Sequence, residues 1–433
     1  MTTIADKLQL TLSTKNAIKQ ALIDKGADVG AVPFASYPAL IGGLSSGGFP
    51  IGTVADWKLD QSSEGWLPLD GSLVSEADWP LLKPLLPNSD GYYDWPGVGL
   101  TGLPDFGTLI ALVKFSPNGQ FLALATSSSS AGQSYKVIRT SDWAEINVPA
   151  FSLGFISALE FSPDSQWLAV GGSAGAHLAV IDLSAGSLVP NTPSISSDVK
   201  ALVFTNDSQQ LIVGAQNSPR IQVFNTQDWS QVAGVPDVNG SVMDFSLTPD
   251  GQQLAIVHWY APFFVVLNTS DWSLQSGTPS LPLTGNTHAQ CCDYSPDGSY
   301  VVVGIYTSPY LLKIDAYDWS ITSPISLSGS VSSAAHSPEG DYLVLPIASS
   351  GGVVIDTYAW EVFADLPIGT DQMRGASFSP SKEYLALALS RGSGSGLVVL
   401  NIFTLAPEGF FYLPTLESIT YGNVTVQPMI KGE

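Results

Sequence analysis

The stretch FSPNGQFLALA, residues 115–125, decides the fold because close copies of it return along the chain. The six further copies are FSPDSQWLAVG at Phe161, FTNDSQQLIVG at Phe204, LTPDGQQLAIV at Leu247, YSPDGSYVVVG at Tyr294, HSPEGDYLVLP at His336 and FSPSKEYLALA at Phe378. The seven copies recur every 42 to 47 residues. A fixed period of this length indicates a repeat architecture.

Each copy combines a turn with an apolar strand. A Ser-Pro-Asp-Gly segment favours a tight turn, because proline fixes φ and glycine accepts a positive φ. The apolar runs after the turn, such as LALA and VVVG, lack polar alternation. Such runs are typical of strands that are buried on both faces. We therefore expect one strand before the turn and a second, buried strand after it.

Most copies also have a second half that ends in Asp-Trp. An apolar segment leads to Trp143, Trp229, Trp272 and Trp319, and to an Ala-Trp pair at Trp360. In the second and seventh copies, Gly186 and Leu405 stand near this place. We expect a third strand before this position and a short fourth strand after it. Four antiparallel strands in a repeat of this length are typical of one propeller blade.

The repeats resemble the WD-repeat family, with Asp-Trp after the third strand where the family has Trp-Asp. The resemblance covers roughly residues 107–412 and implies a seven-bladed β-propeller. We interpret the acidic turn residues and the Asp-Trp pairs as structural, because turn chemistry alone explains Asp and Gly at these positions.

Residues 1–48 predict a short helical leader before the repeats. Apolar residues follow a helical period in two stripes, which are Ile18, Ala21, Leu22 and Lys25, and Tyr37, Leu40, Ile41 and Leu44. Helices this short do not bury an apolar face alone. We therefore expect them to pack on each other, on sister chains or on a larger assembly.

Short motifs flank the repeats on both sides. They are Gly52-Thr53, Gly65-Trp66-Leu67, Asp70-Gly71 and Leu103-Pro104-Asp105 before the repeats, and Tyr412-Leu413-Pro414-Thr415 and Met429-Ile430-Lys431 after them. In this order they resemble the tail-collar module of phage tail fibres. The resemblance implies a small collar-like domain, residues 49–106 and 413–433, which the propeller at 107–412 interrupts. It also implies a homotrimer and a location in the phage virion.

A closed ring suits such an insertion because its two ends emerge close together. Residues 408–413 have a strand-like sequence, so we expect them to supply the outer strand of the seventh blade. In that case both junctions lie on the face that carries the loops between the second and third strands of each blade. If residues before Phe106 close the ring instead, the junctions lie on the opposite face.

Charge and composition exclude several classes of function. The chain has 38 acidic and 16 basic residues, and its net charge of −22 disfavours binding to nucleic acid or to anionic lipid. No apolar run reaches the ~18 residues that a membrane span needs, and MTTIADKLQL has no signal-peptide core. The two cysteines, Cys291 and Cys292, are adjacent, so we expect buried thiols and no disulfide or zinc framework.

No catalytic, cofactor-binding or metal-binding pattern is present in the sequence. The four histidines lack the spacing of a metal site, and no nucleophile-elbow or phosphate-loop motif occurs. A glycosidase would need two carboxylates roughly 5–9 Å apart, and most acids lie in the repeated turns. We therefore expect a protein without a cofactor, a metal or catalysis, and we keep a polysaccharide depolymerase as an alternative.

Aromatic loops in blades three to five form the candidate binding surface. Exposed Trp and Tyr side chains stack on sugars or anchor protein partners. The candidate receptor-binding residues are Arg220, His258, Trp259, Tyr260, His288, Tyr306 and Tyr310. The alternative is that these aromatic residues cover the mouth of the ring or pack between blades.

Together, these patterns predict a phage tail-fibre or receptor-binding protein that is not an enzyme. The leader would attach to other tail proteins, and the propeller would recognise a glycan or a protein on the host surface. A structural baseplate or fibre-hub protein, whose propeller contacts other tail proteins, is the main alternative.

Overall fold

The computed structural model describes residues 54–58, 66–68, 73–75, 91–104, 106, 109–126, 135–149, 151, 153–285, 287–348, 351–366, 372–390, 396–405, 410–412, 419–421 and 424–431. Side chains are described only between residues 99 and 402. The helical leader expected at residues 1–48 and the motifs Gly52-Thr53 and Asp70-Gly71 lie outside the described residues. No helix in the described part of the chain is long and apolar enough to span a membrane.

The chain divides into two compact units, of which one is residues 1–93 with 404–433 and the other is residues 94–403. In the first unit, both ends of the chain contribute to one sheet. Its strands are β1 (Val54–Lys58), β2 (Trp66–Pro68), β30 (Ile419–Tyr421) and β31 (Val424–Lys431). β1 and β2 both pair with β31. The second unit is therefore inserted between two segments that fold together, with boundaries at 94 and 403 where the motifs suggested 107 and 412.

Seven small antiparallel sheets make up the described part of unit 94–403. The first sheet contains β5 (Ile110–Phe115), β6 (Phe121–Thr126) and β7 (Tyr135–Arg139). The second contains β8 (Ile156–Phe161), β9 (Trp167–Gly172), β10 (Leu178–Asp182) and β11 (Ser187–Leu188). The third contains β12 (Val199–Phe204), β13 (Gln210–Ala215) and β14 (Ile221–Asn225). The fourth sheet contains β15 (Val242–Leu247), β16 (Gln253–His258) and β17 (Phe264–Asn268). The fifth contains β18 (Ala289–Tyr294), β19 (Tyr300–Ile305), β20 (Leu311–Asp315) and β21 (Ile321–Thr322). The sixth contains β22 (Ala335–His336), β23 (Tyr342–Ile347), β24 (Gly351–Asp356) and β25 (Glu361–Asp365). The seventh is β26 (Gln372–Phe378), β27 (Tyr384–Ser390), β28 (Leu397–Leu405) and β4 (Gly91–Gly99).

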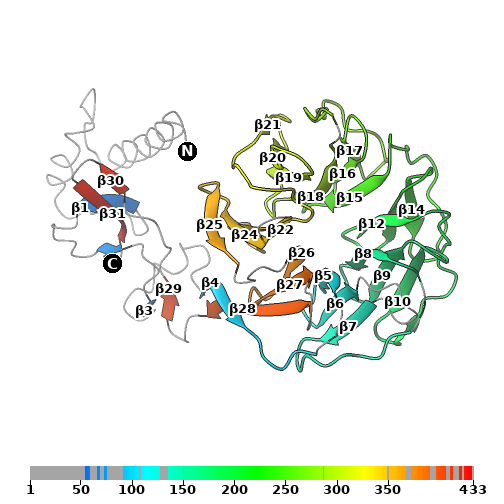
Figure 1. The fold of residues 1–433 in the computed structure, drawn as a ribbon, viewed down its shortest axis with the longest axis horizontal. Helices are drawn as coiled ribbons and strands as arrows, with labels where there is room; N and C mark the ends of the chain where they lie inside the picture. Colours follow the sequence, from blue (N-terminus) through cyan, green and yellow to red (C-terminus); the bar gives the residue numbers. More distant parts are fainter. Residues whose placement is uncertain are drawn as a thin grey trace, which may run out of the picture. The chain divides into compact units, whose positions relative to one another are not determined.

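These sheets follow one another around a common centre (Figure 1). The first strands of successive sheets contact each other, as β8 does with β12 and β15 with β18. The ring closes because β26 of the seventh sheet contacts β5 of the first. The unit is thus a β-propeller with one sheet for each of the seven repeats, as the repeat count predicted.

The seventh blade takes its outer strand from the chain before the first repeat. β4 lies next to β28, and the N–H of Leu100 donates to the carbonyl of Val399 at 2.8 Å. The expectation that residues 408–413 would fill this place is wrong. They contain β29 (Phe410–Tyr412), which pairs with β3 (Leu73–Ser75). A strand-like sequence does not determine which strand a short segment pairs with, and here that pairing depends on tertiary contacts.

This closure also changes where the propeller chain ends. β28 starts at the loop that follows β27 and runs to the other end of its blade. The chain therefore leaves the ring on the face opposite the loops between second and third strands. The expectation that the junctions would share a face with those loops is corrected accordingly.

The repeated turns use the predicted chemistry. In each of the seven turns one residue has a positive φ, and these residues are Gly119, Ser165, Ser208, Gly251, Gly298, Gly340 and Lys382. In the fifth turn, the Ser295 hydroxyl donates to Asp297 Oδ1 at 2.6 Å. Asp297 Oδ1 also accepts the N–H of Ser299 at 3.0 Å. The acid at this position is therefore occupied by its own turn, and the same holds for Asp207 and Asp250.

The Asp-Trp positions pack neighbouring blades together. Residues with φ between 53° and 60° occupy this place, and they are Trp143, Gly186, Trp229, Trp272, Trp319 and Trp360. The ring of Trp360 lies 5.4 Å from that of Tyr300 in the preceding blade. Trp143 of the first blade lies 5.2 Å from Tyr384 of the seventh in the same way. Gly186 keeps the backbone conformation of the motif without its side chain.

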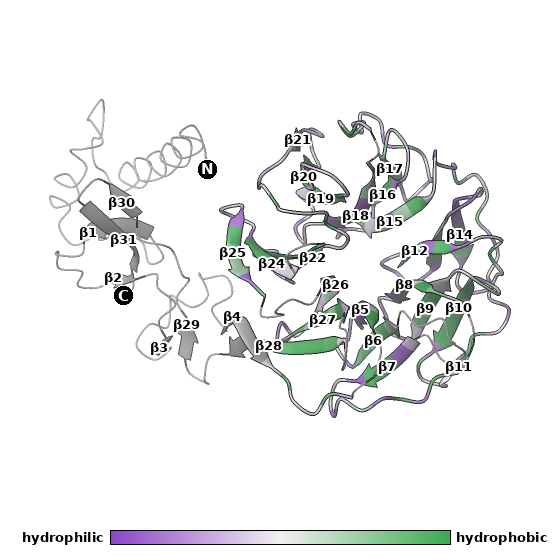
Figure 2. Cartoon of the chain, in the orientation of Figure 1, coloured by the Kyte–Doolittle hydropathy of each residue, from purple (hydrophilic) through white to green (hydrophobic). Residues whose placement is uncertain are grey.

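Buried strands supply the core of the ring, and strands such as β9 and β10 are mostly hydrophobic (Figure 2). The outermost pairing is weak in some blades, where it shrinks to a single bridge such as Ile138 with Glu145 or Leu267 with Leu274. Cys291 and Cys292 are both buried and free, as expected. Burial raises the pKa of both thiols well above the ordinary value.

Candidate functional site

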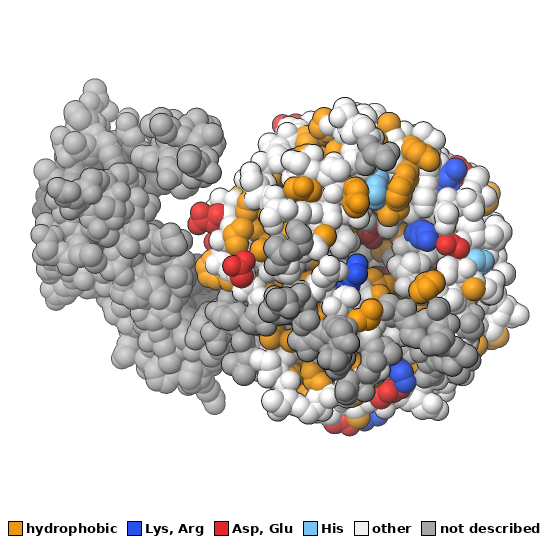
Figure 3. Space-filling model, viewed as in Figure 1, with side chains coloured by type: hydrophobic (Ala, Val, Ile, Leu, Met, Phe, Trp, Pro, Cys, Tyr) orange, Lys and Arg blue, Asp and Glu red, His pale blue; other side chains and the backbone are white. Residues whose placement is uncertain are grey.

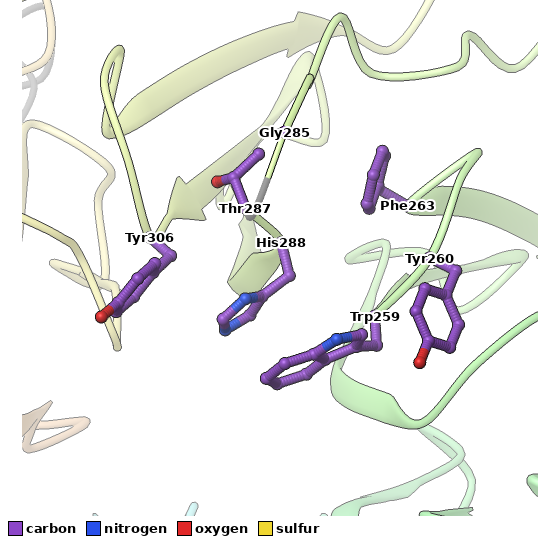
Figure 4. A pocket seen from close by; sticks show the side chains of 7 residues that line it. All are labelled: Trp259, Tyr260, Phe263, Gly285, Thr287, His288 and Tyr306. Carbon is purple, nitrogen blue, oxygen red and sulfur yellow. The ribbon is translucent and has the colours of Figure 1, made fainter.

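Three loop segments of the fourth and fifth blades meet on one face of the ring. They are the β16–β17 loop at residues 259–263, the β19–β20 loop at residues 306–310 and the segment that leads into β18. The first loop is a tight turn, because the N–H of Phe263 donates to the carbonyl of Tyr260 at 2.8 Å. Figure 4 shows the aromatic side chains that these segments present. On this face of the ring, hydrophobic side chains lie on both sides of a histidine (Figure 3).

The imidazole of His288 is stacked between two aromatic rings. Its ring lies 3.8 Å from that of Trp259 with an interplanar angle of 16°. On the other side, Tyr306 lies 5.1 Å away at 14°. The three rings are therefore nearly parallel and form what we call the ring stack, Trp259–His288–Tyr306 (Figure 4).

Two hydrogen bonds hold the loop that carries Tyr306 against the segment that carries His288. The N–H of Tyr306 donates to the carbonyl of His288 at 3.1 Å. The Thr307 hydroxyl donates to the Thr287 hydroxyl at 2.8 Å. His288 itself is only 8% exposed. Burial lowers the pKa of His288, so the imidazole at the centre of the stack is neutral at pH 7.

A cavity of about 440 Å³ opens beside the stack, and we call it the loop pocket. Its lining residues are Trp259, Tyr260, Phe263, Gly285, Thr287, His288 and Tyr306. Trp259, Tyr260 and Tyr306 are 40%, 58% and 51% exposed, which is high for large aromatic side chains. The volume falls within the range of small-molecule sites. Exposed rings around a cavity of this size can bind the flat apolar side of a ligand.

Gly240 allows the aromatic loop to sit where it does. Its φ is +110°, and a Cβ at this position would lie 2.8 Å from Cδ2 of Tyr260 and 3.0 Å from the backbone nitrogen of Tyr260. The neighbouring Asn239 donates from Nδ2 to the carbonyl of Ala261 at 3.1 Å. The loop that carries Trp259 and Tyr260 therefore rests on the backbone segment that leads into β15 of the same blade.

The structure brings together four of the seven candidate residues, namely Trp259, Tyr260, His288 and Tyr306. Arg220 does not line the loop pocket and instead pairs with Asp237, with an Nη1–Oδ2 distance of 3.4 Å. His258 is fully buried at the end of β16, where its Nδ1 lies 2.8 Å from the carbonyl oxygen of Asn239. Tyr310 is half-buried and packs against the core between the fifth and sixth blades.

Three lining residues were not among the candidates. Phe263 ends the same loop as Trp259, and Gly285 and Thr287 precede His288 in the chain. Phe263 is 9% exposed and forms one wall of the pocket. The available signal was proximity in the chain to the selected aromatic residues. Chain proximity gives no direction for a side chain, so it could not have separated Phe263 from Tyr310.

Charged side chains gather on the innermost strands near the middle of the ring (Figure 3). Lys114 Nζ lies 2.8 Å from Glu160 Oε2, and the Glu160 charge raises the pKa of Lys114. Burial raises the pKa of Asp244 to about 7, although its carboxylate accepts the N–H of Cys292 at 3.1 Å. The carboxylate of Asp293 accepts the N–H of His336 at 3.1 Å.

These contacts join one blade to the next, so the charged side chains in them stabilise the ring. Among the described residues, no group of three or more His, Cys, Asp or Glu side chains could hold a metal ion. The charged cluster therefore differs from the loop pocket, whose exposed side chains have room for a ligand.

Comparisons with known proteins support the fold. The family model described as "WD domain, G-beta repeat" matches residues 149–180, which contain most of the second blade. Among solved structures, the chain is similar to the Kuenenia stuttgartiensis hydrazine synthase, with a TM-score of 0.54 and 13% sequence identity. That match covers 71% of this chain and 99% of the other. No curated protein matches the sequence. At this identity the likeness concerns the propeller fold alone.

Proposed function

We propose that this chain is a receptor-binding protein of a phage tail fibre and that it binds the host surface through the loop pocket without catalysis. The ring stack Trp259–His288–Tyr306 carries this proposal, because it leaves large aromatic surfaces exposed beside a cavity. Aromatic anchors of this kind dominate the binding energy of recognition sites.

The phage assignment rests on the motifs that flank the propeller. Those motifs resemble the tail-collar module. All of them except Leu103-Pro104-Asp105 lie in segments that belong to one compact unit, although the propeller separates these segments in the chain. Leu103 instead packs against the core of the propeller. In this proposal the collar-like unit forms a homotrimer and residues 1–48 attach it to other tail proteins. The protein would then be located in the virion.

The composition of the pocket favours binding over catalysis. None of its seven lining residues is a carboxylate, whereas glycoside hydrolysis ordinarily uses two. The acids of the repeated turns are bonded within their own turns, as Asp250 is to Thr248 and Gln252. A depolymerase is therefore the weaker alternative for this face of the ring.

The direct test is competition for adsorption. Purified full-length protein is added to host cells before the phage that carries it, and free phage is counted. We expect the protein to block adsorption and to migrate as a trimer in mass photometry. Protein that leaves adsorption unchanged but binds a purified tail component would instead support the baseplate or fibre-hub alternative. A stable monomer that binds neither would refute both assignments.

A further inference from the structure

Resting on the proposed function, we infer that the loop pocket binds an uncharged sugar ring, which lies against the exposed aromatic side chains beside His288. The ligand would be a neutral hexopyranose unit of a surface polysaccharide. A charged glycan and a protein partner are the alternatives that the geometry disfavours.

The ring stack is closed to insertion, so a ligand has to use its outer surfaces. A ring between two others needs about 7 Å between them, because each contact takes roughly 3.5 Å. Trp259 and Tyr306 lie only 3.8 and 5.1 Å from His288. The stack therefore acts as a preformed platform. The three side chains are already ordered in the free protein, so binding costs little further conformational entropy, which favours a small, weakly interacting ligand.

The pocket offers no charge to a ligand. Among the residues that the structure describes, its lining contains no Asp, Glu, Lys or Arg. His288 is neutral at pH 7 because burial lowers its pKa. Arg220, in the neighbouring blade, is engaged by Asp237 at 3.4 Å and by the carbonyl of Val238 at 3.1 Å. A charged sugar would lose water without gaining a counter-ion, which is unfavourable. The net charge of −22 adds a general repulsion for acidic polysaccharides.

Hydroxyl groups that line the pocket match a ligand rich in hydroxyls. Tyr260 and Tyr306 are exposed and carry phenolic oxygens that both donate and accept. The Thr287 hydroxyl accepts the proton of Thr307, and its own proton has no acceptor within the described part of the chain, so it can donate to a ligand. Flat apolar surface with a few hydroxyl groups is the combination that one face of a pyranose ring requires, since its C–H groups pack and its hydroxyls bond at the rim.

The size of the site argues against a protein partner. A stable protein interface uses about 20–30 residues on each side. The loop pocket offers seven lining residues, of which Phe263, Thr287 and His288 are nearly buried. A single sugar unit fits a concave site of about 440 Å³ better than an extended protein surface does.

Saturation-transfer NMR on the full-length protein at pH 7 tests this inference. The neutral probes are methyl glucoside, methyl galactoside and N-acetylglucosamine, and the acidic probes are glucuronic acid and N-acetylneuraminic acid. We expect transfer to the C–H protons of at least one neutral probe and none to the acidic probes. Transfer to no neutral probe, or equal transfer to acidic probes, would overturn the inference.

Three variants locate the binding. Trp259→Ala should weaken binding of the neutral probe by about five- to tenfold. Trp259→Phe retains a ring and should recover much of the affinity. Tyr317→Ala is the matched control, because Tyr317 is 82% exposed in the same propeller and does not line the pocket. Equal affinity of Trp259→Ala and Tyr317→Ala would contradict the assignment, provided that their thermal unfolding matches the wild type.

Treatment of host cells separates this inference from the function on which it rests. Periodate destroys sugar rings, and protease removes surface proteins. Loss of cell binding after periodate supports the sugar, whereas loss only after protease overturns the sugar and keeps the receptor-binding function. Binding of neutral sugars by a protein that binds no cells would support the sugar site and refute the receptor-binding function.

Discussion

Replacing Ser377 with alanine tests how the ring closes. In the structure, the Phe115 N–H of the first blade donates to Ser377 Oγ of the seventh blade at 3.0 Å, and both residues are buried. The equivalent bond between the fourth and fifth blades joins Tyr294 N–H to Ser246 Oγ at 2.9 Å. The closing interface is thus chemically the same as an internal one.

The expected cost follows from the lost acceptor. Alanine removes the oxygen and leaves the N–H of Phe115 without a partner in a buried site. Such a group costs about 1–3 kcal/mol. Since Ser246→Ala leaves Tyr294 in the same position, it should cost a similar amount. The two variants therefore form a matched pair, one at the closing interface and one inside the ring.

Chemical denaturation and hydrogen exchange measure the effect. We expect both variants to lower the free energy of unfolding by about 1–3 kcal/mol and to speed exchange of the amides at Phe115 and Tyr294 respectively. A destabilised Ser246→Ala beside an unchanged Ser377→Ala would show that the first and seventh blades are not joined as described. If neither variant changed stability, the argument from buried acceptors would fail.

Three further predictions concern the turns, the loop face and the thiols. Hydroxyl and backbone N–H donors lower the pKa of Asp207 and Asp250. The stabilisation of the fold by these two carboxylates is therefore complete above pH 4–5 and is lost as the pH falls through the lowered pKa values. The melting temperature should drop by several degrees below about pH 4, and a melting temperature that stays constant down to pH 2.5 would refute this. Gly240→Ala should destabilise the propeller by about 1–3 kcal/mol and weaken ligand binding. In the control Gly234→Ala, the added Cβ meets nothing within 4 Å, so this variant should be destabilised only by the backbone strain of alanine at a positive φ. Equal effects of the two variants on thermal unfolding and on binding would exclude the clash with Tyr260. Cys291 and Cys292 should resist iodoacetamide in the native protein at pH 8 and react after denaturation, because burial raises their pKa; rapid native labelling followed by mass spectrometry would contradict this.

The propeller could be predicted because its determinants are local and repeated. Turn chemistry at positions such as Gly119 and Gly251 acts within a few residues, and the period then gives the number of blades. The closing strand could not be predicted in this way. β4 and residues 410–412 both have strand-forming sequences, and only the folded ring shows which of them pairs next to β28.

The candidate site was predictable in position but not in detail. Loop residues with large aromatic side chains, such as Trp259 and Tyr306, reached the pocket. His258 is the last residue of β16 and is fully buried, with its Nδ1 2.8 Å from the carbonyl oxygen of Asn239. The Arg220 side chain pairs with the carboxylate of Asp237, which lies 17 residues later in the chain. Such long-range pairings depend on the geometry of adjacent blades, which the sequence of one loop does not contain.

The central claim is that exposed rings beside His288 make the loop pocket a recognition site. Its most direct test is a titration of fluorescently labelled full-length protein on a panel of bacterial strains, with wild type, Trp259→Ala and Tyr317→Ala compared on each strain that binds. We expect Trp259→Ala to bind about five- to tenfold more weakly and Tyr317→Ala to match the wild type. Binding of Trp259→Ala at wild-type strength would contradict the claim.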